Sequence, residues 1–217
     1  MFDTSGPFVC AGSAFDGYSG GSVRDMPKGQ AENLFPIIEQ VLEARNWTLA
    51  EIDAVGVATG PGNFTGIRIS VSAARGLGLA LGVPVFGITQ FELAYGQTPV
   101  PAGTLVSVPA PRDLAYIEGF GTNGCAGQPQ IIDPAHPPKA LQLSFGMSVH
   151  GHRAAEIATH SEASAHPSNY TPDPARMADI AVAKYLAATQ FPPPPAPNYV
   201  KPPDAAPARD MPPLIVP

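Results

Sequence analysis

The sequence predicts an α/β fold of two lobes, the second smaller and less regular than the first. Two apolar segments are predicted as buried strands, at residues 52–58 and 83–88, and each precedes a helical pattern, at residues 66–81 and 90–95. Strands that alternate with helices along the chain are typical of a sheet covered by helices. We therefore expect an N-terminal α/β lobe over residues 1–96.

An earlier hairpin and helix complete this lobe. Residues 8–15 alternate in the manner of a strand, Asp16-Gly17 is a typical hairpin turn, and residues 18–24 form the returning strand. In residues 31–45, leucine, isoleucine and valine recur at helical spacing and form one apolar stripe. The lobe thus has the strands and helices that one covered sheet needs.

The chain beyond the first lobe has a looser pattern. Paired strands are predicted at residues 105–108 and 116–120, and a last helix at residues 176–189. Proline makes up about two-fifths of the final segment, which therefore cannot form a regular helix or sheet. We expect a smaller C-terminal α/β lobe over residues 97–190 and a proline-rich extended tail over residues 191–217.

The charge of the chain argues against a direct grip on nucleic acid. Its net charge is −6 and it has only 12 lysines and arginines, whereas affinity for a phosphate backbone comes from cations that displace counterions. Charged residues make up 14% of the chain, against about 25% in typical domains, which favours a protein partner for the more apolar surface. Cys10 and Cys125 are expected as reduced thiols, and without an apolar run of about 18 residues we expect a cytoplasmic protein with no membrane contact.

Residues 58–82 are the most informative segment of the sequence. Gly60 and Gly62 permit a positive φ, Pro61 fixes its own φ, and Thr65 is the predicted N-cap of the helix that follows. Free amides at such a helix N-terminus can bind an anion, but the segment lacks the Gly-Lys-Ser/Thr of a Walker A loop. Two interpretations stay open: a sharp junction between strand and helix, and an anion contact.

This segment resembles the GPGSFTGxRxG-like motif of the TsaB family, whose members are partner subunits in the synthesis of threonylcarbamoyladenosine on tRNA. Asp3-Thr4-Ser5 resembles the first turn of that family, and residues 31–38 resemble its first-helix motif. Residues 197–201 resemble its C-terminal PxYxR, with lysine in place of arginine. The residues that carry the motifs are Gly60, Pro61, Gly62, Phe64, Thr65, Gly66, Arg68, Tyr199 and, as a replacement, Lys201.

The resemblance implies a two-lobed actin-like fold (the ASKHA group, with ribonuclease H-like lobes) whose second lobe is reduced, and a two-fold-like relation between the lobes. It implies a non-catalytic subunit that pairs with a TsaD-like transferase and activates it for threonylcarbamoylation of the tRNA adenosine 3′ of the anticodon. The chain itself would require no cofactor, because nucleotide and metal are expected on that partner. We also expect a TsaE-like ATPase to dock on the pair, a homodimer when the chain is alone, and only indirect contact with tRNA.

The alternative function is an ATP-binding small kinase or hydrolase of the same fold group. In ATP-using members, an early aspartate followed by hydroxyl residues positions metal and phosphates. His150 and His152 have the spacing of a shared metal on a strand, but no third ligand stands out and no nucleophile motif is present. We predict no catalytic residue and no metal ligand. The weak candidates for cofactor binding are Asp3, Thr4, Ser5, Gly60, Gly62 and Thr65.

The helical segment at residues 66–81 is apolar or small nearly all round, with Arg68 and Arg75 as its only charges. Such a helix is typically buried on more than one side. In TsaB relatives the first two helices form a bundle with the equivalent helices of TsaD or of a second TsaB. The predicted partner interface is Leu34, Ile37, Ile38, Val41, Ile67, Val71, Ala74 and Gly78.

Overall fold

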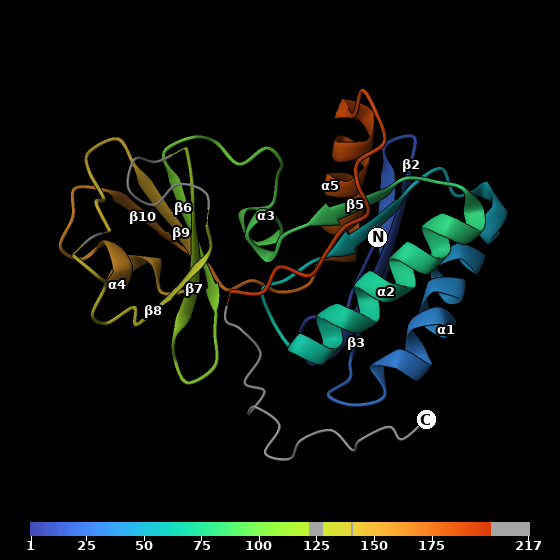
Figure 1. Ribbon diagram of the computed structural model, residues 1–217, viewed down its shortest axis with the longest axis horizontal. Coiled ribbons are helices and arrows are strands. Elements are labelled where there is room, and N and C mark those ends of the chain that lie inside the picture. The colour runs from blue at the N-terminus through green and yellow to red at the C-terminus, as the bar shows by residue number, and fades with distance from the viewer. Residues whose placement is uncertain (122–127, 140, 201–217) are drawn as a thin grey trace, which may run out of the picture.

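The computed structural model describes residues 1–121, 128–139 and 141–200, and it has two five-stranded sheets in two lobes (Figure 1). The first sheet contains β1 (Phe2–Asp3), β2 (Phe8–Phe15), β3 (Tyr18–Asp25), β4 (Val55–Ala58) and β5 (Val85–Ile88). The second contains β6 (Thr104–Pro109), β7 (Ala115–Phe120), β8 (Gln130–Ile132), β9 (Ser148–Gly151) and β10 (Ser164–Pro167). The helices are α1 (Gln30–Glu43), α2 (Phe64–Leu81), α3 (Gln90–Tyr95), α4 (Ala154–Ala158) and α5 (Pro174–Ala187).

The two sheets repeat one topology. In the first sheet the strand order is β3-β2-β1-β4-β5, with β1, β2 and β3 antiparallel and β1, β4 and β5 parallel. In the second the order is β8-β7-β6-β9-β10, with the same pattern of directions. The second lobe is reduced, because α4 has 5 residues where α2, in the equivalent place, has 18. The two-lobed actin-like fold with a reduced second lobe is thus confirmed, and its two sheets share one strand order.

The lobes exchange helices. Helix α3 follows the first sheet but packs against β6 and β9 of the second, and Figure 1 shows it between the two sheets. Helix α5 follows the second sheet but packs against β2, β3, β4 and β5 of the first. The division by sequence placed α5 within residues 97–190, whereas its packing belongs to the first lobe. The exchange fixes the lobes to each other at two separate places.

The first sheet is covered on both faces. Val9 and Ala11 of β2 join the apolar core under α1 and α2, while Cys10 between them joins the core under α5. The Cys10 thiol donates to the Met177 sulfur at 3.4 Å, and burial raises the pKa of that thiol to about 12. Cys10 is therefore an inert core residue; Cys125 lies outside the described residues.

Most predicted elements of the first lobe are confirmed, with shifted ends. The hairpin turns at Asp16 and Gly17, both with positive φ, as predicted. The strand predicted from residue 52 starts only at Val55, and residues 52–54 link it to a short 3₁₀ helix at Leu49–Glu51. Helix α2 starts at Phe64, so Thr65 is not its N-cap; Asn63 is, and its side chain accepts from the Gly66 amide at 2.9 Å. Among the described residues, no helix combines the length and the apolar character that crossing a membrane requires.

Candidate functional site: two packed loops and the outer face of two helices

The loop after β1 and the loop before α2 pack directly on each other. The Asn63 amide donates to the Ser5 carbonyl at 2.6 Å, and the Thr4 hydroxyl donates to the Gly66 carbonyl at 2.6 Å. Glycine is required at this contact, because a Cβ on Gly66 would overlap the Thr4 carbonyl oxygen and one on Gly62 would lie 2.6 Å from the Ser5 carbonyl oxygen. Two segments about 60 residues apart thus form one close junction.

Asp3 lies at the centre of this junction and is fully buried. One carboxylate oxygen accepts from the Ser5 amide at 2.7 Å, and the other accepts from the Gln90 side chain at 2.7 Å. Gln90 also donates to the Ser5 hydroxyl at 2.6 Å, and its backbone amide donates to the Gly60 carbonyl at 2.8 Å. Burial raises the pKa of Asp3, and these hydrogen bonds oppose the rise. Both carboxylate oxygens are engaged by protein groups.

The weak nucleotide candidates are therefore brought together, with one exception. Asp3, Thr4, Ser5 and Gly60 are buried in the junction, and Gly62 lies at its surface. Thr65 is exposed on the first turn of α2. The Gly66 amide, one of the free amides that an anion would use, is already taken by the cap. The contacts favour a structural junction over an anion site.

Two glutamines that sequence reasoning did not single out hold the loops. Besides Gln90, the Gln30 side chain at the start of α1 donates to the carbonyls of Gly6 at 2.6 Å and Phe8 at 2.8 Å. No motif marks such residues, since a glutamine gains its role only from the backbone carbonyls that the fold brings to it.

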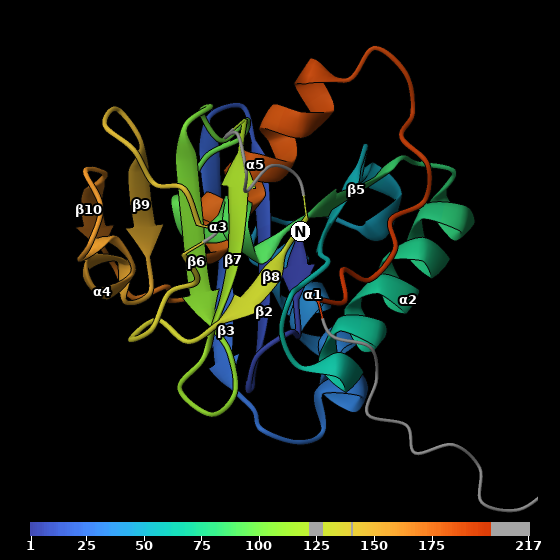
Figure 2. The ribbon, with the colours of Figure 1, turned by 60° about the vertical axis from the view of Figure 1, so that its left-hand side comes forward.

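The C-terminal segment is fastened to the start of α2. The Arg68 side chain donates to the Tyr199 hydroxyl at 2.8 Å, and its guanidinium carbon lies 3.8 Å from the centre of the Phe64 ring. The Phe64 and Tyr199 rings are 4.8 Å apart, and the Asn198 amide donates to the Thr59 carbonyl at 2.7 Å. Figure 2 shows the segment, in red, descending beside α2. The motif residues Phe64, Arg68 and Tyr199 thus contact one another. Lys201 lies outside the described residues.

The predicted partner interface needs correction at the level of its side chains. The members of the predicted set, Leu34, Ile37, Ile38, Val41, Ile67, Val71, Ala74 and Gly78, are all buried. The physical reason is that this stripe faces the sheet of its own lobe and forms its main core. A partner can reach only the opposite sides of the same two helices.

Those opposite sides form what we call the outer face. On α2 it carries Leu79, which is 87% exposed, and a row of exposed small residues four apart, Ser72, Gly76 and Ala80. On α1 it carries Phe35, which is 41% exposed. Around Gly76 there is open space, because a Cβ there would meet no heavy atom within 4 Å. A partner helix could therefore approach the α2 backbone closely.

The face of the second sheet that lies toward α3 carries polar side chains. Glu118 of β7 and His150 of β9 both lie opposite Val106 of β6, so they share one face. The His150 ring stacks on His166 at 4.4 Å and meets the Tyr95 ring at 5.0 Å, and burial lowers the pKa of His150. Within the described ranges, no group of three or more metal-ligating side chains gathers around the histidines or elsewhere.

Protonation of Glu118 makes the stability of the folded chain depend on pH. One of its carboxylate oxygens is buried without a hydrogen-bond partner among the described residues, and burial, followed by the charge of Glu92, raises its pKa from 4.5 to about 7. The folded chain therefore holds this proton at pH values where the unfolded chain has lost it. The stability that this proton contributes is complete below about pH 4.5 and is lost as the pH rises to about 7.

We expect Glu118→Gln to remove this loss. A fully buried group with this shift would contribute about 3 kcal/mol, and the partial solvent access of Glu118 reduces the effect to on the order of 1 to 2 kcal/mol. Thermal unfolding of both proteins at pH 5 and pH 8 measures it, with the variant gaining about 2–6 °C over wild type at pH 8 relative to pH 5. An equal pH dependence in the two proteins would contradict the assignment.

Comparisons with known proteins agree with this fold. A family model described as "TsaD: tRNA N6-adenosine threonylcarbamoyltransferase" matches residues 24–110. An uncharacterized protein of Mycobacterium tuberculosis is 38% identical over 103 residues, which cover 46% of this chain and 48% of that protein. The tRNA threonylcarbamoyladenosine biosynthesis protein TsaB of Escherichia coli K12 is 32% identical over 71 residues, 32% of this chain and 31% of that protein.

A solved structure extends the likeness to nearly the whole chain. It is of a Pseudomonas aeruginosa protein described as similar to peptidase YEAZ, with a TM-score of 0.69 and 20% identity, covering 92% of this chain and 97% of that one. At this identity the likeness shows the fold. The chain spans about half the length or less of the curated relatives it matches. The family-model match, the relatives named TsaB and the shared fold together support the assignment of the chain to the TsaB family.

Proposed function

We propose that this chain is a non-catalytic subunit that pairs with a TsaD-like transferase and activates it for threonylcarbamoylation of the tRNA adenosine 3′ of the anticodon. The observation that carries the proposal is the outer face of α1 and α2. Exposed Leu79 lies on α2 with a row of small residues, Phe35 is exposed on α1, and small residues let two helix backbones come close. Relatives named for threonylcarbamoyladenosine biosynthesis support the pathway.

The packing of the two loops supports the non-catalytic part of the proposal. Both oxygens of Asp3 accept hydrogen bonds from this chain, and the glycines of the second loop bring protein backbone, rather than a ligand, close to it. Nucleotide and metal are then assigned to the TsaD-like partner. The acidic charge of −6 supports only indirect contact with tRNA.

The same outer face would serve a homodimer when the chain is alone. A partner and a second copy would then compete for one surface, because both would bury Leu79 and the small residues beside it. A TsaE-like ATPase would dock elsewhere on the assembled pair.

The test is a transfer assay with the purified TsaD-like subunit of the same organism, threonylcarbamoyl-AMP and substrate tRNA. We expect modified tRNA only when this chain is added, and no ATP hydrolysis by this chain alone. Full transfer without the chain would contradict the activating role. Hydrolysis of ATP by the isolated chain, abolished by Asp3→Asn, would favour the small kinase or hydrolase instead.

A further inference from the structure

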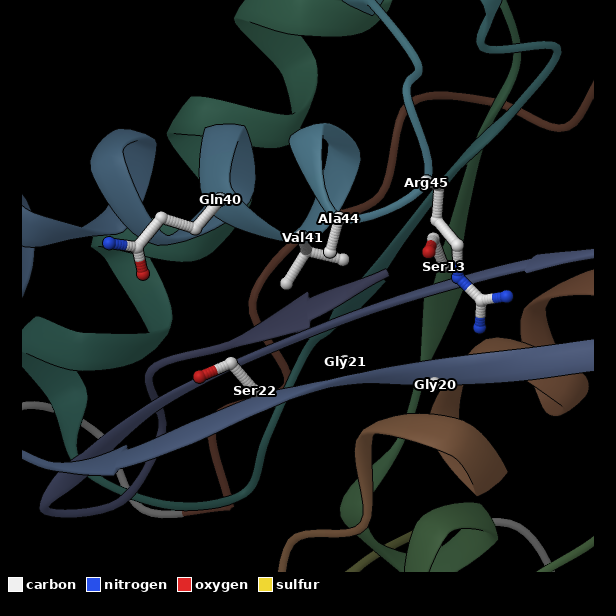
Figure 3. A pocket seen from close by; sticks show the side chains of 8 residues that line it. All are labelled: Ser13, Gly20, Gly21, Ser22, Gln40, Val41, Ala44 and Arg45. Carbon is white, nitrogen blue, oxygen red and sulfur yellow. The ribbon is translucent and has the colours of Figure 1, made fainter.

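A hollow lies between α1 and the β2–β3 hairpin, well away from the loop junction (Figure 3). It exists because β3 places small residues under the helix: Gly20 pairs with Ser13 of β2, and Ser22 pairs with Ala11, so both share the face that α1 covers. The helix cannot fill the space that these residues leave. The hollow has a volume of about 370 Å³, which is within the range of small-molecule sites and far above the roughly 30 Å³ that one water takes.

Ser13 brings an unpaired hydroxyl to this hollow. The residue is only 9% exposed, and its Oγ has no hydrogen-bond partner among the described residues. Buried hydroxyls are normally paired. The Ser13 oxygen is closed to solvent in this rotamer, so a group in the hollow would reach it only after the side chain rotates. Figure 3 shows Ser13 beside the stem of Arg45.

Arg45 brings an unpaired positive charge to the same place. Its side chain reaches toward Gly20, where a Cβ would lie 2.9 Å from one guanidinium nitrogen, so glycine is what admits it. Within the described part of the chain, Arg45 has no hydrogen bond or ion pair from its side chain. No aspartate or glutamate lines the hollow, and the neutral Gln40 side chain, which does line it, accepts from Arg24.

A simpler role for Arg45 would be to cap the end of α1. The carbonyls of the last turn are already served by backbone amides, however: Gln40 accepts from Ala44, and Leu42 accepts from Arg45 and Trp47. The guanidinium is not needed there, and its donors face the hollow.

We propose that this hollow is a binding site for a small oxyanion, a carboxylate or a phosphate group. The Arg45 guanidinium supplies two parallel N–H donors to two oxygens of the anion, which is the geometry in which arginine binds such groups most strongly. After rotation of its side chain, the Ser13 hydroxyl donates to the same anion.

The test is an NMR titration of the isotope-labelled full chain with inorganic phosphate and, separately, with acetate, at an ionic strength held constant with chloride. Ser13, Gly20, Gly21 and Ser22 line the hollow, and the NMR signals of their backbone amides report binding. We expect shifts that saturate and are confined to these amides and their neighbours. Arg45→Gln should weaken binding by about tenfold or more, and Ser13→Ala by a smaller factor.

The matched control is Lys139→Gln, which removes one positive charge from an exposed position in the second lobe and should leave the affinity unchanged. Saturation with phosphate only identifies a phosphate site, and saturation with acetate only identifies a carboxylate site. Shifts that never saturate, or an affinity equal in wild type and Arg45→Gln, would overturn the proposal. If Arg45→Gln disturbs the fold, Arg45→Lys replaces it as the test variant, because lysine keeps the positive charge but lacks the two parallel N–H donors of the guanidinium. An affinity of Arg45→Lys equal to that of wild type would contradict the proposed site.

Discussion

Gly66→Ala is expected to destabilise the chain by more than about 3 kcal/mol, a loss typical of a severe steric clash in a packed region. The new Cβ would overlap the carbonyl oxygen of Thr4, which is backbone and cannot rotate away. The loops would have to separate, and the hydrogen bonds from Thr4 to Gly66 and from Asn63 to Ser5 would go with them. Urea unfolding followed by circular dichroism measures the loss.

Gly76→Ala is the matched control on the same helix. A Cβ there meets no heavy atom within 4 Å, so the change should raise stability by up to about 1 kcal/mol through helix propensity alone. Comparing the two substitutions thus separates the steric clash at Gly66 from the effect of alanine on helix propensity, which both share. Wild-type stability in Gly66→Ala would mean that the two loops do not pack as described.

Gly76→Arg is expected to weaken pairing with the TsaD-like subunit by at least about thirtyfold, which corresponds to the roughly 2 kcal/mol of a residue at the centre of an interface. The reason is that the long side chain would stand between two helix backbones that small residues otherwise let approach. The isolated chain should keep its fold, because the position opens to solvent. Isothermal titration calorimetry with the purified subunit gives the affinity.

Ala183→Arg provides the control for this change. It adds the same side chain at an exposed position of α5, on the opposite side of the first sheet from α1 and α2, and should bind the partner like wild type. Equal affinity of Gly76→Arg and wild type would move the interface away from the outer face. A loss in Ala183→Arg alone would place it on α5.

The sequence was a good guide to elements whose pattern is local. The hairpin at Asp16-Gly17 was predicted because its turn residues have the required chemistry, and α3 was predicted with its observed ends. The N-cap of α2 was misplaced at Thr65 because Asn63 is an equally good capping residue, and only the position of the first turn decides between them.

Elements that depend on distant partners were harder to foresee. Strands β9 and β10 have few β-branched residues and are held by ladders to β6 and to each other. The inner face of α2 could not be told from its outer face, since the helix is small or apolar nearly all round, and only the sheet beneath it buries one side. For the same reason, the sequence did not predict that α3 packs on the second sheet and α5 on the first.

The proposed function requires that this chain bind a TsaD-like subunit. Size-exclusion chromatography with light scattering of the chain, the subunit and their mixture tests it most directly. We predict that the mixture gives one species with the mass of one copy of each chain, and that any homodimer of this chain disappears as the subunit is added. Two separate species at every mixing ratio, with masses unchanged from those of the isolated proteins, would contradict it.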